Sequence, residues 1–114
     1  MLINVTHDYA LRMCCHLARK GGCASSREIA DATGVPRDYL VQIAQRLRDA
    51  GIVYAIPGKH GGYGLAKEPS AIAAFDVIFA LEGHDGREKS REASRVSVAI
   101  VEALSRTTVE DVIA

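Results

Sequence analysis

Several features that would place this chain in other protein classes are missing from it. No apolar run approaches the ~20 residues of a membrane-spanning helix, and the first residues lack the basic head and apolar middle of a secretion signal. Low-complexity tracts are absent and 48% of the residues are hydrophobic, which argues against a disordered chain. We expect a cytoplasmic protein with no membrane partner, and its 114 residues suffice for one domain of ordinary size.

Cysteine is scarce, with Cys14, Cys15 and Cys23 as the only three. An odd number of cysteines without a secretion signal argues against a disulfide framework. Cys14 and Cys15 fall in one helical pattern, where adjacent side chains point about 100° apart, so they are poor ligands for a shared metal ion. We interpret them as small core residues, because free cysteine is among the most buried residue types. A redox role is the alternative.

Catalytic and metal-binding sets are also missing. Cys14, Cys15 and His16 are neighbours in one predicted helix, so a nucleophile, a base and an orienting group cannot be assembled from them. His7 and Asp8 carry possible ligand atoms, but an acidic residue at a helix start is explained by the helix dipole. We expect neither enzyme activity nor a metal site.

The net charge is zero, which is unusual for a nucleic-acid-binding protein. The two halves of the chain nevertheless differ. Residues 1–67 contain nine Lys/Arg and five Asp/Glu, a charge of +4, whereas residues 68–114 contain five and nine, a charge of −4. A basic half joined to an acidic half favours a DNA-facing module attached to a module with a different task.

The segment from Gly34 to Ala66 predicts a helix, a turn and a two-stranded hairpin. Pro36 suits the first position of a helix, where its missing N–H would have no partner. Gly51 is expected to end the helix, because glycine adopts the left-handed conformation at low cost. Apolar residues recur between them at the spacing of one buried helical stripe, at Leu40, Ile43, Ala44 and Leu47.

A hairpin with a basic tip follows this helix. Residues 52–56 are a β-prone run, and residues 63–66 form the second strand. The turn at 58–62 contains three glycines, which tolerate positive φ, together with Lys59 and His60. Helix, strand, glycine-rich tip and strand in this order are typical of the recognition helix and wing of a winged helix-turn-helix.

Two helices are expected before this segment. The first covers residues 1–20 and begins near Thr6 as its cap. The second begins at Ser25, which with Glu28 three residues later forms a capping-box pattern, and it ends at Gly34. Two helices joined by a glycine-containing turn are the sequence form of a helix-turn-helix.

Three further helices are expected after the hairpin. Apolar residues from 72 to 81 predict a fourth helix that Gly83 ends, and Thr108 caps a last short helix. Between them, residues 93–105 predict a long helix with a wide apolar face that little of the domain remains to cover. The simplest way to bury this face is against the same helix of a second subunit. We therefore predict that Val96, Ile100, Val101 and Leu104 are dimerisation residues.

The outward face of the central helix and the hairpin tip carry side chains suited to DNA. In the major groove, Gln pairs bidentately with adenine and Arg with guanine. Glycine lets backbone amides approach a phosphate, lysine supplies charge, and a helix N-terminus holds a phosphate. A solvated helix face beside an ordinary hairpin is the alternative. The candidate DNA-binding residues are Ser25, Ser26, Arg27, Arg37, Tyr39, Val41, Gln42, Gln45, Arg46, Lys59, His60, Gly61 and Tyr63.

The order of several motifs resembles that of the Rrf-type bacterial winged-helix regulators. The resemblance covers nearly the whole chain and rests on TxxDYALR from Thr6, REIA from Arg27, GVPRDYLVQIAQRLRDAGIV from Gly34, GGYGLA from Gly61 and DVIFALEG from Asp76. It implies a homodimer that binds double-stranded DNA at a dyad-symmetric site, with recognition helices in successive major grooves.

The chain departs from the family pattern in three regions. Iron–sulfur members carry three cysteines in the loop before the dimerisation helix, whereas residues 84–95 contain none, so we expect no cluster and no other cofactor. Pro57 stands where the family's wing often has an arginine, leaving Lys59 and His60 for contacts. Val41 replaces a base-reading glutamate of some members, and it suits a thymine methyl group.

These observations predict a mainly α fold with a small β-hairpin. Residues 1–83 would form a winged helix-turn-helix DNA-binding domain, and residues 84–114 a loop, a long C-terminal dimerisation helix and a short C-terminal helix. The predicted function is that of a homodimeric, sequence-specific DNA-binding transcription repressor. The alternatives are a winged-helix module that binds a protein, and a thiol-responsive regulator that uses the N-terminal cysteines.

Overall fold

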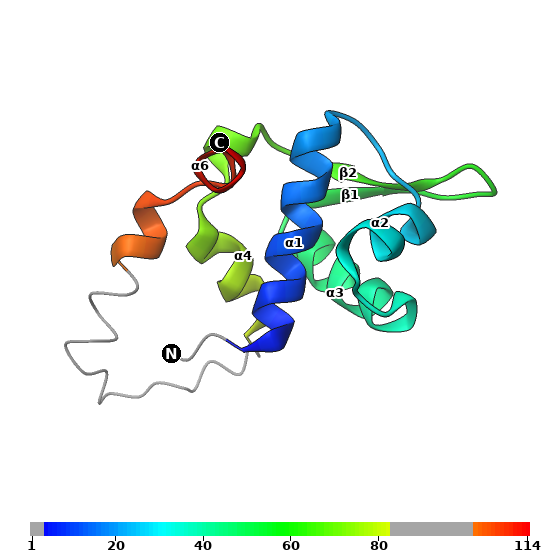
Figure 1. Cartoon of the computed structure of the whole chain (residues 1–114), viewed down its shortest axis with the longest axis horizontal. Coiled ribbons are helices and arrows are strands. Elements are labelled where there is room, and N and C mark those ends of the chain that lie inside the picture. Colours follow the sequence, from blue (N-terminus) through cyan, green and yellow to red (C-terminus); the bar gives the residue numbers. More distant parts are fainter. Residues whose placement is uncertain (1–3, 83–101) are drawn as a thin grey trace.

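The computed structural model describes residues 4–82 and 102–114, and helix α1 (Val5–Lys20) runs through its centre (Figure 1). The cap of α1 is Asn4, whose side chain accepts the His7 amide hydrogen, and not Thr6 as predicted. Asn4 precedes the helix and can satisfy one of its unpaired amides, which Thr6 inside the first turn cannot. The interpretation of Cys14 and Cys15 as core residues is confirmed, since their exposed fractions are 0% and 5%.

Helices α2 (Ser26–Thr33) and α3 (Arg37–Asp49) form a helix-turn-helix that packs against α1. Gly34 ends α2 in the left-handed conformation, and Gly51, just beyond the end of α3, is also left-handed, as expected of a helix-terminating glycine. Pro36 is the residue before the first helical position rather than that position itself. The predicted apolar stripe is confirmed, with exposed fractions of at most 1% at Leu40, Ile43, Ala44 and Leu47.

Strands β1 (Val53–Ile56) and β2 (Gly62–Leu65) form the predicted antiparallel hairpin, in which Ile56 pairs with Gly62. One further backbone pair extends it: Ala24 and Tyr63 exchange N–H···O bonds of 2.9 and 3.0 Å. Ala24 precedes Ser25, the cap of α2, so this pair fixes the start of α2 against β2.

The segment after the hairpin contains a 3₁₀ helix, η1 (Pro69–Ala71), and α4 (Ala74–Leu81). Ile72, predicted to lie in the fourth helix, instead lies between η1 and α4 and is buried. Its carbonyl accepts the amide hydrogen of Val109 at 2.8 Å.

The last helix, α6 (Val109–Ile113), is capped by Thr108 as predicted, and its first residue is fully buried. Helix α1 thus contacts two groups of elements: α2, α3 and the hairpin on one side, and α4 and α6 on the other (Figure 1). The hairpin extends past α2, at the opposite end of the molecule from α6.

Most of the predicted dimerisation helix falls outside the described residues. Val96, Ile100 and Val101 lie there, as do Gly83 and the predicted domain boundary after it. Residues 102–106 are helical, and Leu104 among them is half-buried. No helix of the described part of the chain is both long and apolar enough to cross a membrane.

We predict that Gly62→Ala destabilises the fold by about 1–3 kcal/mol, the usual cost of forcing extra atoms into packed structure. A Cβ at Gly62 would collide with the backbone carbonyl of Ala24, so the pair that joins the hairpin to the start of α2 must open. Gly22→Ala is the control, since a Cβ there meets nothing within 4 Å. Urea unfolding of both variants tests this, and equal midpoints would contradict it.

Candidate nucleic-acid interface

The outward face of α3 presents side chains that the fold itself does not use. Val41 is 46% exposed, and Gln42 and Gln45 are also exposed. The amide of Gln45 donates to Asp49 at 3.0 Å, one turn further along the helix. Among the described residues Gln42 has no hydrogen-bond partner, so its amide is free to bind another molecule.

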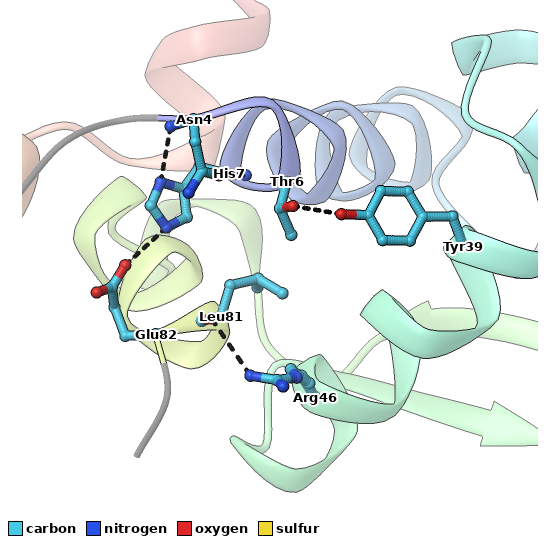
Figure 2. A network of polar contacts seen from close by, with 7 residues as sticks. All are labelled: Asn4, Thr6, His7, Tyr39, Arg46, Leu81 and Glu82. Carbon is cyan, nitrogen blue, oxygen red and sulfur yellow. Dashed lines mark hydrogen bonds and ion pairs between the residues drawn. The ribbon is translucent and has the colours of Figure 1, made fainter. Parts of the chain in front are cut away.

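Two predicted DNA contacts of α3 point instead toward α1 and α4 (Figure 2). The Tyr39 hydroxyl lies 2.6 Å from Thr6 Oγ1, and its ring meets that of Tyr9 edge to face with centroids 5.6 Å apart. Arg46 donates from Nη1 to the carbonyl of Leu81 at 3.3 Å. These side chains fasten α3 to its neighbours, and their predicted DNA contacts stay predictions.

The N-terminus of α2 is joined to the start of α3. Ser25 Oγ accepts the Glu28 amide hydrogen at 3.0 Å, and Ser26 Oγ accepts from Arg37 Nε at 3.1 Å. Arg27 and Arg37 line a hollow of about 470 Å³ at the turn between the two helices. Asp31 also lines it, so the hollow has two guanidinium groups against one carboxylate. Such a site suits an anion, and in a DNA-binding protein the anion is a backbone phosphate.

The Glu28 carboxylate does not complete the capping box that its spacing predicts. It binds Lys20 Nζ at 2.6 Å and His16 Nε2 at 3.0 Å, both on α1. These two hydrogen bonds lower the pKa of Glu28. The carboxylate of Glu28 is thereby held against α1, away from the backbone amides at the start of α2 where a phosphate would bind. Sequence spacing gives no sign of this contact, because its partners come from another helix.

The hairpin tip combines exposed basic side chains with a glycine that nothing else can replace. Lys59 and His60 are exposed. A Cβ on Gly61 would collide with the carbonyl oxygen of Ile56, so the close turn requires glycine. Tyr63 is half-buried and its backbone binds Ala24. The tip, the start of α2 and α3 are therefore parts of one connected framework.

The three cysteines lie in different surroundings. Burial raises the pKa of Cys14 to about 12, and burial also raises the pKa of Cys15. Cys23 is partly exposed, and its Sγ lies 3.2 Å from the Tyr54 hydroxyl on β1. This hydrogen bond raises the pKa of Tyr54. Within residues 4–82 and 102–114, no three His, Cys, Asp or Glu side chains are grouped as metal ligands.

The chain is similar to known transcriptional regulators along its whole length. The sequence model of the Rrf2 family, described as an iron-dependent transcriptional regulator, matches residues 3–94. The HTH-type transcriptional regulator CymR of Bacillus subtilis (strain 168) is 38% identical over 97% of this chain and 88% of its own. The solved structure of that global cysteine regulator superposes with a TM-score of 0.83 and 35% identity, covering 99% of this chain and 96% of the other.

Two further solved structures are similar. IscR of T. potens has a TM-score of 0.82 and 32% identity, covering 99% of this chain and 86% of its own. The oxidized form of Staphylococcus aureus CymR has a TM-score of 0.79 and 29% identity, covering 99% and 96%. All of these proteins share the fold of this chain. Their sequence identities of 29–38% show that the similarity extends to the sequence as well.

We predict that a thiol reagent modifies one cysteine in the native protein at pH 8. Cys23 should react at least about 100-fold faster than Cys14, because the thiolate is the nucleophile and burial both excludes the reagent and raises the pKa of Cys14. Brief treatment with iodoacetamide followed by peptide mass spectrometry measures the rates, and denatured protein should react at all three cysteines. Equal native rates at Cys14 and Cys23 would contradict the prediction.

Proposed function

Because the chain belongs to the Rrf2 family of transcriptional regulators, we propose that it is a homodimeric repressor that binds a dyad-symmetric DNA site in the cytoplasm. The observation that carries this proposal is the exposed framework of α2, α3 and the hairpin tip. It combines the guanidinium groups of Arg27 and Arg37, which line one hollow, with the amide of Gln42, unpartnered among the described residues, and the exposed Lys59.

Each part of this framework has a distinct task on DNA. Helix α3 enters the major groove, where Gln42 meets an adenine edge and Val41 a thymine methyl group. Arg27 and Arg37 hold a backbone phosphate at the turn, and Lys59 holds another from the wing. The phosphate contacts fix the register of the helix, and the base contacts select the sequence.

A dimer gives the protein its two-fold target. Two recognition helices about 34 Å apart match one turn of DNA, so the site contains two inverted halves. The apolar pattern of residues 93–105 supports dimerisation through that segment, and the half-buried Leu104 lies in its helical end. A ligand or modification that changes the separation of the two helices would release the DNA.

We propose that the chain works without the iron–sulfur cluster that some members of its family carry. Residues 84–95 contain no cysteine, and the chain's own three thiols are either buried in α1 or bonded to Tyr54. A cluster held by three cysteines in that loop is therefore not part of the proposed function. As its relatives are regulators, we also propose no enzymatic activity.

We predict that Gln42→Ala and Lys59→Ala weaken DNA binding in different ways. Gln42→Ala should lose about 1–3 kcal/mol of discrimination between operator and random DNA, as expected for a base contact. Lys59→Ala should weaken binding to operator and to random DNA alike. It should also reduce the magnitude of the slope of log affinity against log salt by about 1, as expected for the loss of one phosphate contact. Fluorescence-polarisation titrations at two salt concentrations, with DNA from upstream of the gene, measure both effects.

Lys67→Ala is the matched control, since Lys67 is also exposed but lines a hollow beside α6 and not the hairpin tip. Its affinity and salt slope should equal those of the unchanged protein. Tight native binding that neither Gln42→Ala nor Lys59→Ala alters would contradict the assigned surface. Absence of any DNA binding, with a protein retained instead in pull-downs, would favour the protein-interaction module.

A thiol response at Cys23 is a second candidate function, favoured by its partial exposure and its contact with the wing. Hydrogen peroxide is the proposed oxidant. The Cys23 thiolate attacks one peroxide oxygen, the O–O bond breaks, and sulfenic acid and hydroxide form, the latter taking up a proton to give water. The added oxygen disrupts the Sγ contact to Tyr54, and thus the seating of β1 against the segment before α2. A relative, the CymR of Staphylococcus aureus, has been solved in an oxidized form.

We predict that peroxide lowers operator affinity several-fold in the native protein and that dithiothreitol restores it. The response should disappear in Cys23→Ser and persist in Cys15→Ala, because Cys15 is buried. Polarisation titrations before and after oxidation measure the change. A response that survives in Cys23→Ser would remove this second function.

A further inference from the structure

A polar hollow of about 450 Å³ lies where the N-terminal end of α1, helix α3 and the C-terminal end of α4 meet. Sites for small molecules span about 300–1,000 Å³, so the hollow suits a small metabolite and not a macromolecule. Seven of its nine lining residues are polar, which is unusual for space left by imperfect core packing. Its principal polar side chains are Thr6, His7, Tyr39, Gln42, Arg46 and Glu82.

The hollow contains one cation and one anion that do not neutralise each other. Arg46 comes from α3 and Glu82 from the end of α4, and they form no ion pair within residues 4–82 and 102–114. In Figure 2 the Arg46 and Glu82 side chains come from different elements, with Leu81 between them. A guanidinium and a carboxylate held apart on one hollow are complementary to a molecule that carries both charges.

Both charged groups retain unused hydrogen-bonding capacity. Arg46 donates from Nη1 to the Leu81 carbonyl at 3.3 Å, and its remaining N–H groups have no partner in the described part of the chain. Glu82 uses Oε2 to bind His7 Nε2 at 2.8 Å, and its Oε1 has no partner there. A guanidinium binds a carboxylate strongly through paired N–H groups, and a carboxylate oxygen accepts from an ammonium group.

Buried contacts hold the carboxylate in place. His7 is 1% exposed, and its Nδ1 accepts the Asn4 amide hydrogen at 3.1 Å. The proton of the neutral ring therefore lies on Nε2, which donates it to Glu82. Asn4 Oδ1 in turn accepts the His7 amide hydrogen, which fixes the ring against the first turn of α1 (Figure 2). The anionic end of the hollow is thus formed before any ligand arrives.

The opposite wall is fixed in the same manner. The Tyr39 hydroxyl and Thr6 Oγ1 are joined at 2.6 Å, and the Tyr9 ring supports the Tyr39 ring from its edge. A site whose polar groups are already oriented spends less binding free energy on ordering them. We propose that this hollow binds a small zwitterion, an amino acid, with its carboxylate on Arg46 and its ammonium group on Glu82.

The position of the hollow makes its ligand an effector of DNA binding, an inference that rests on the proposed function. Tyr39, Gln42 and Arg46 all belong to α3, and Gln42 lines the hollow. A bound zwitterion ties α3 more firmly to the ends of α1 and α4, and it can engage the amide that would otherwise meet a base. We expect the zwitterion to lower operator affinity, and by reciprocity the operator to lower zwitterion affinity by the same factor.

Nuclear magnetic resonance on ¹⁵N-labelled full-length protein tests the site without DNA. The probes are the twenty proteinogenic L-amino acids and the ω-amino acids β-alanine, 4-aminobutyrate and 6-aminohexanoate, which vary the separation of the two charges. At least one should give saturable shifts at the Arg46 Nε, His7 Nε2 and Tyr39 amide signals. Its methyl ester, lacking the carboxylate charge, and its N-acetyl form, lacking the ammonium charge, should each bind at least about tenfold more weakly.

Matched variants assign the binding to the two charges. Arg46→Gln and Glu82→Gln should each weaken binding at least about tenfold, whereas Arg48→Gln on the same helix and Glu110→Gln on α6 should leave it unchanged. Arg48 and Glu110 are exposed and do not line the hollow. Because Arg46→Gln leaves the His7 contact intact, it remains informative even if Glu82→Gln unfolds the protein.

The outcomes separate the site from the proposed function. No saturable shift with any probe overturns the site, as does equal binding of the zwitterion, its ester and its N-acetyl form. Binding that requires Arg46 and Glu82 supports the site even if the protein binds no DNA, a result that would overturn the proposed function alone. If the zwitterion lowers the operator affinity of the unchanged protein but not that of Arg46→Gln, the effector role is supported. If the zwitterion leaves the operator affinity of the unchanged protein as it was, that role is overturned.

Discussion

The burial of helix α1 is the constraint on which the rest of the structure depends. Met13, Cys14 and Leu17 lie 0–1% exposed because the helix-turn-helix covers one side of α1 and α4 with α6 covers the other. A helix apolar on so wide a face has no stable position at a surface. Every functional element is consequently positioned relative to α1, including α3, the hairpin through Ala24, and the hollow at its N-terminal end.

Local sequence features predicted most of this architecture because they act within a few residues. The spacing of Leu40, Ile43 and Leu47 specifies one buried helical face, and the glycines at 34 and 51 terminate helices by a conformation other residues avoid. The hairpin followed from β-prone runs around a glycine-rich turn. The cap of α1 was less predictable than those of α2 and α6, since Thr6 and Asn4 are both suitable residues two positions apart and only the observed backbone conformation of Asn4 decides between them.

The candidate interface was predictable as a set of residue types, but its internal contacts were not. Tyr39 and Arg46 lie on the flanks of α3, where a rotation of a few tens of degrees decides between DNA and the body of the protein. Their partners, Thr6 and Leu81, lie more than thirty residues away in the sequence. The sequence marks His7 as a possible metal ligand, whereas its role in orienting Glu82 depends on a residue seventy-five positions later, at the end of α4. Such contacts leave no pattern in the local sequence.

The zero net charge of the chain becomes compatible with DNA binding once the charges are placed in space. Among the five acidic residues of the basic half, Asp8 pairs with Arg12 and Glu28 with Lys20, all but Glu28 on α1. Asp49 is bound by Gln45. These contacts place two of the five, Asp8 and Glu28, with the cations that neutralise them, on and beside α1. The other three, Asp31, Asp38 and Asp49, lie on α2 and α3, where they are outnumbered by five basic side chains, Arg27, Arg37, Arg46, Arg48 and, at the hairpin tip, Lys59. The basic side chains of α2, α3 and the hairpin tip are left to set the local potential, and a phosphate within a Debye length of about 10 Å responds to that potential and not to the sum over the chain.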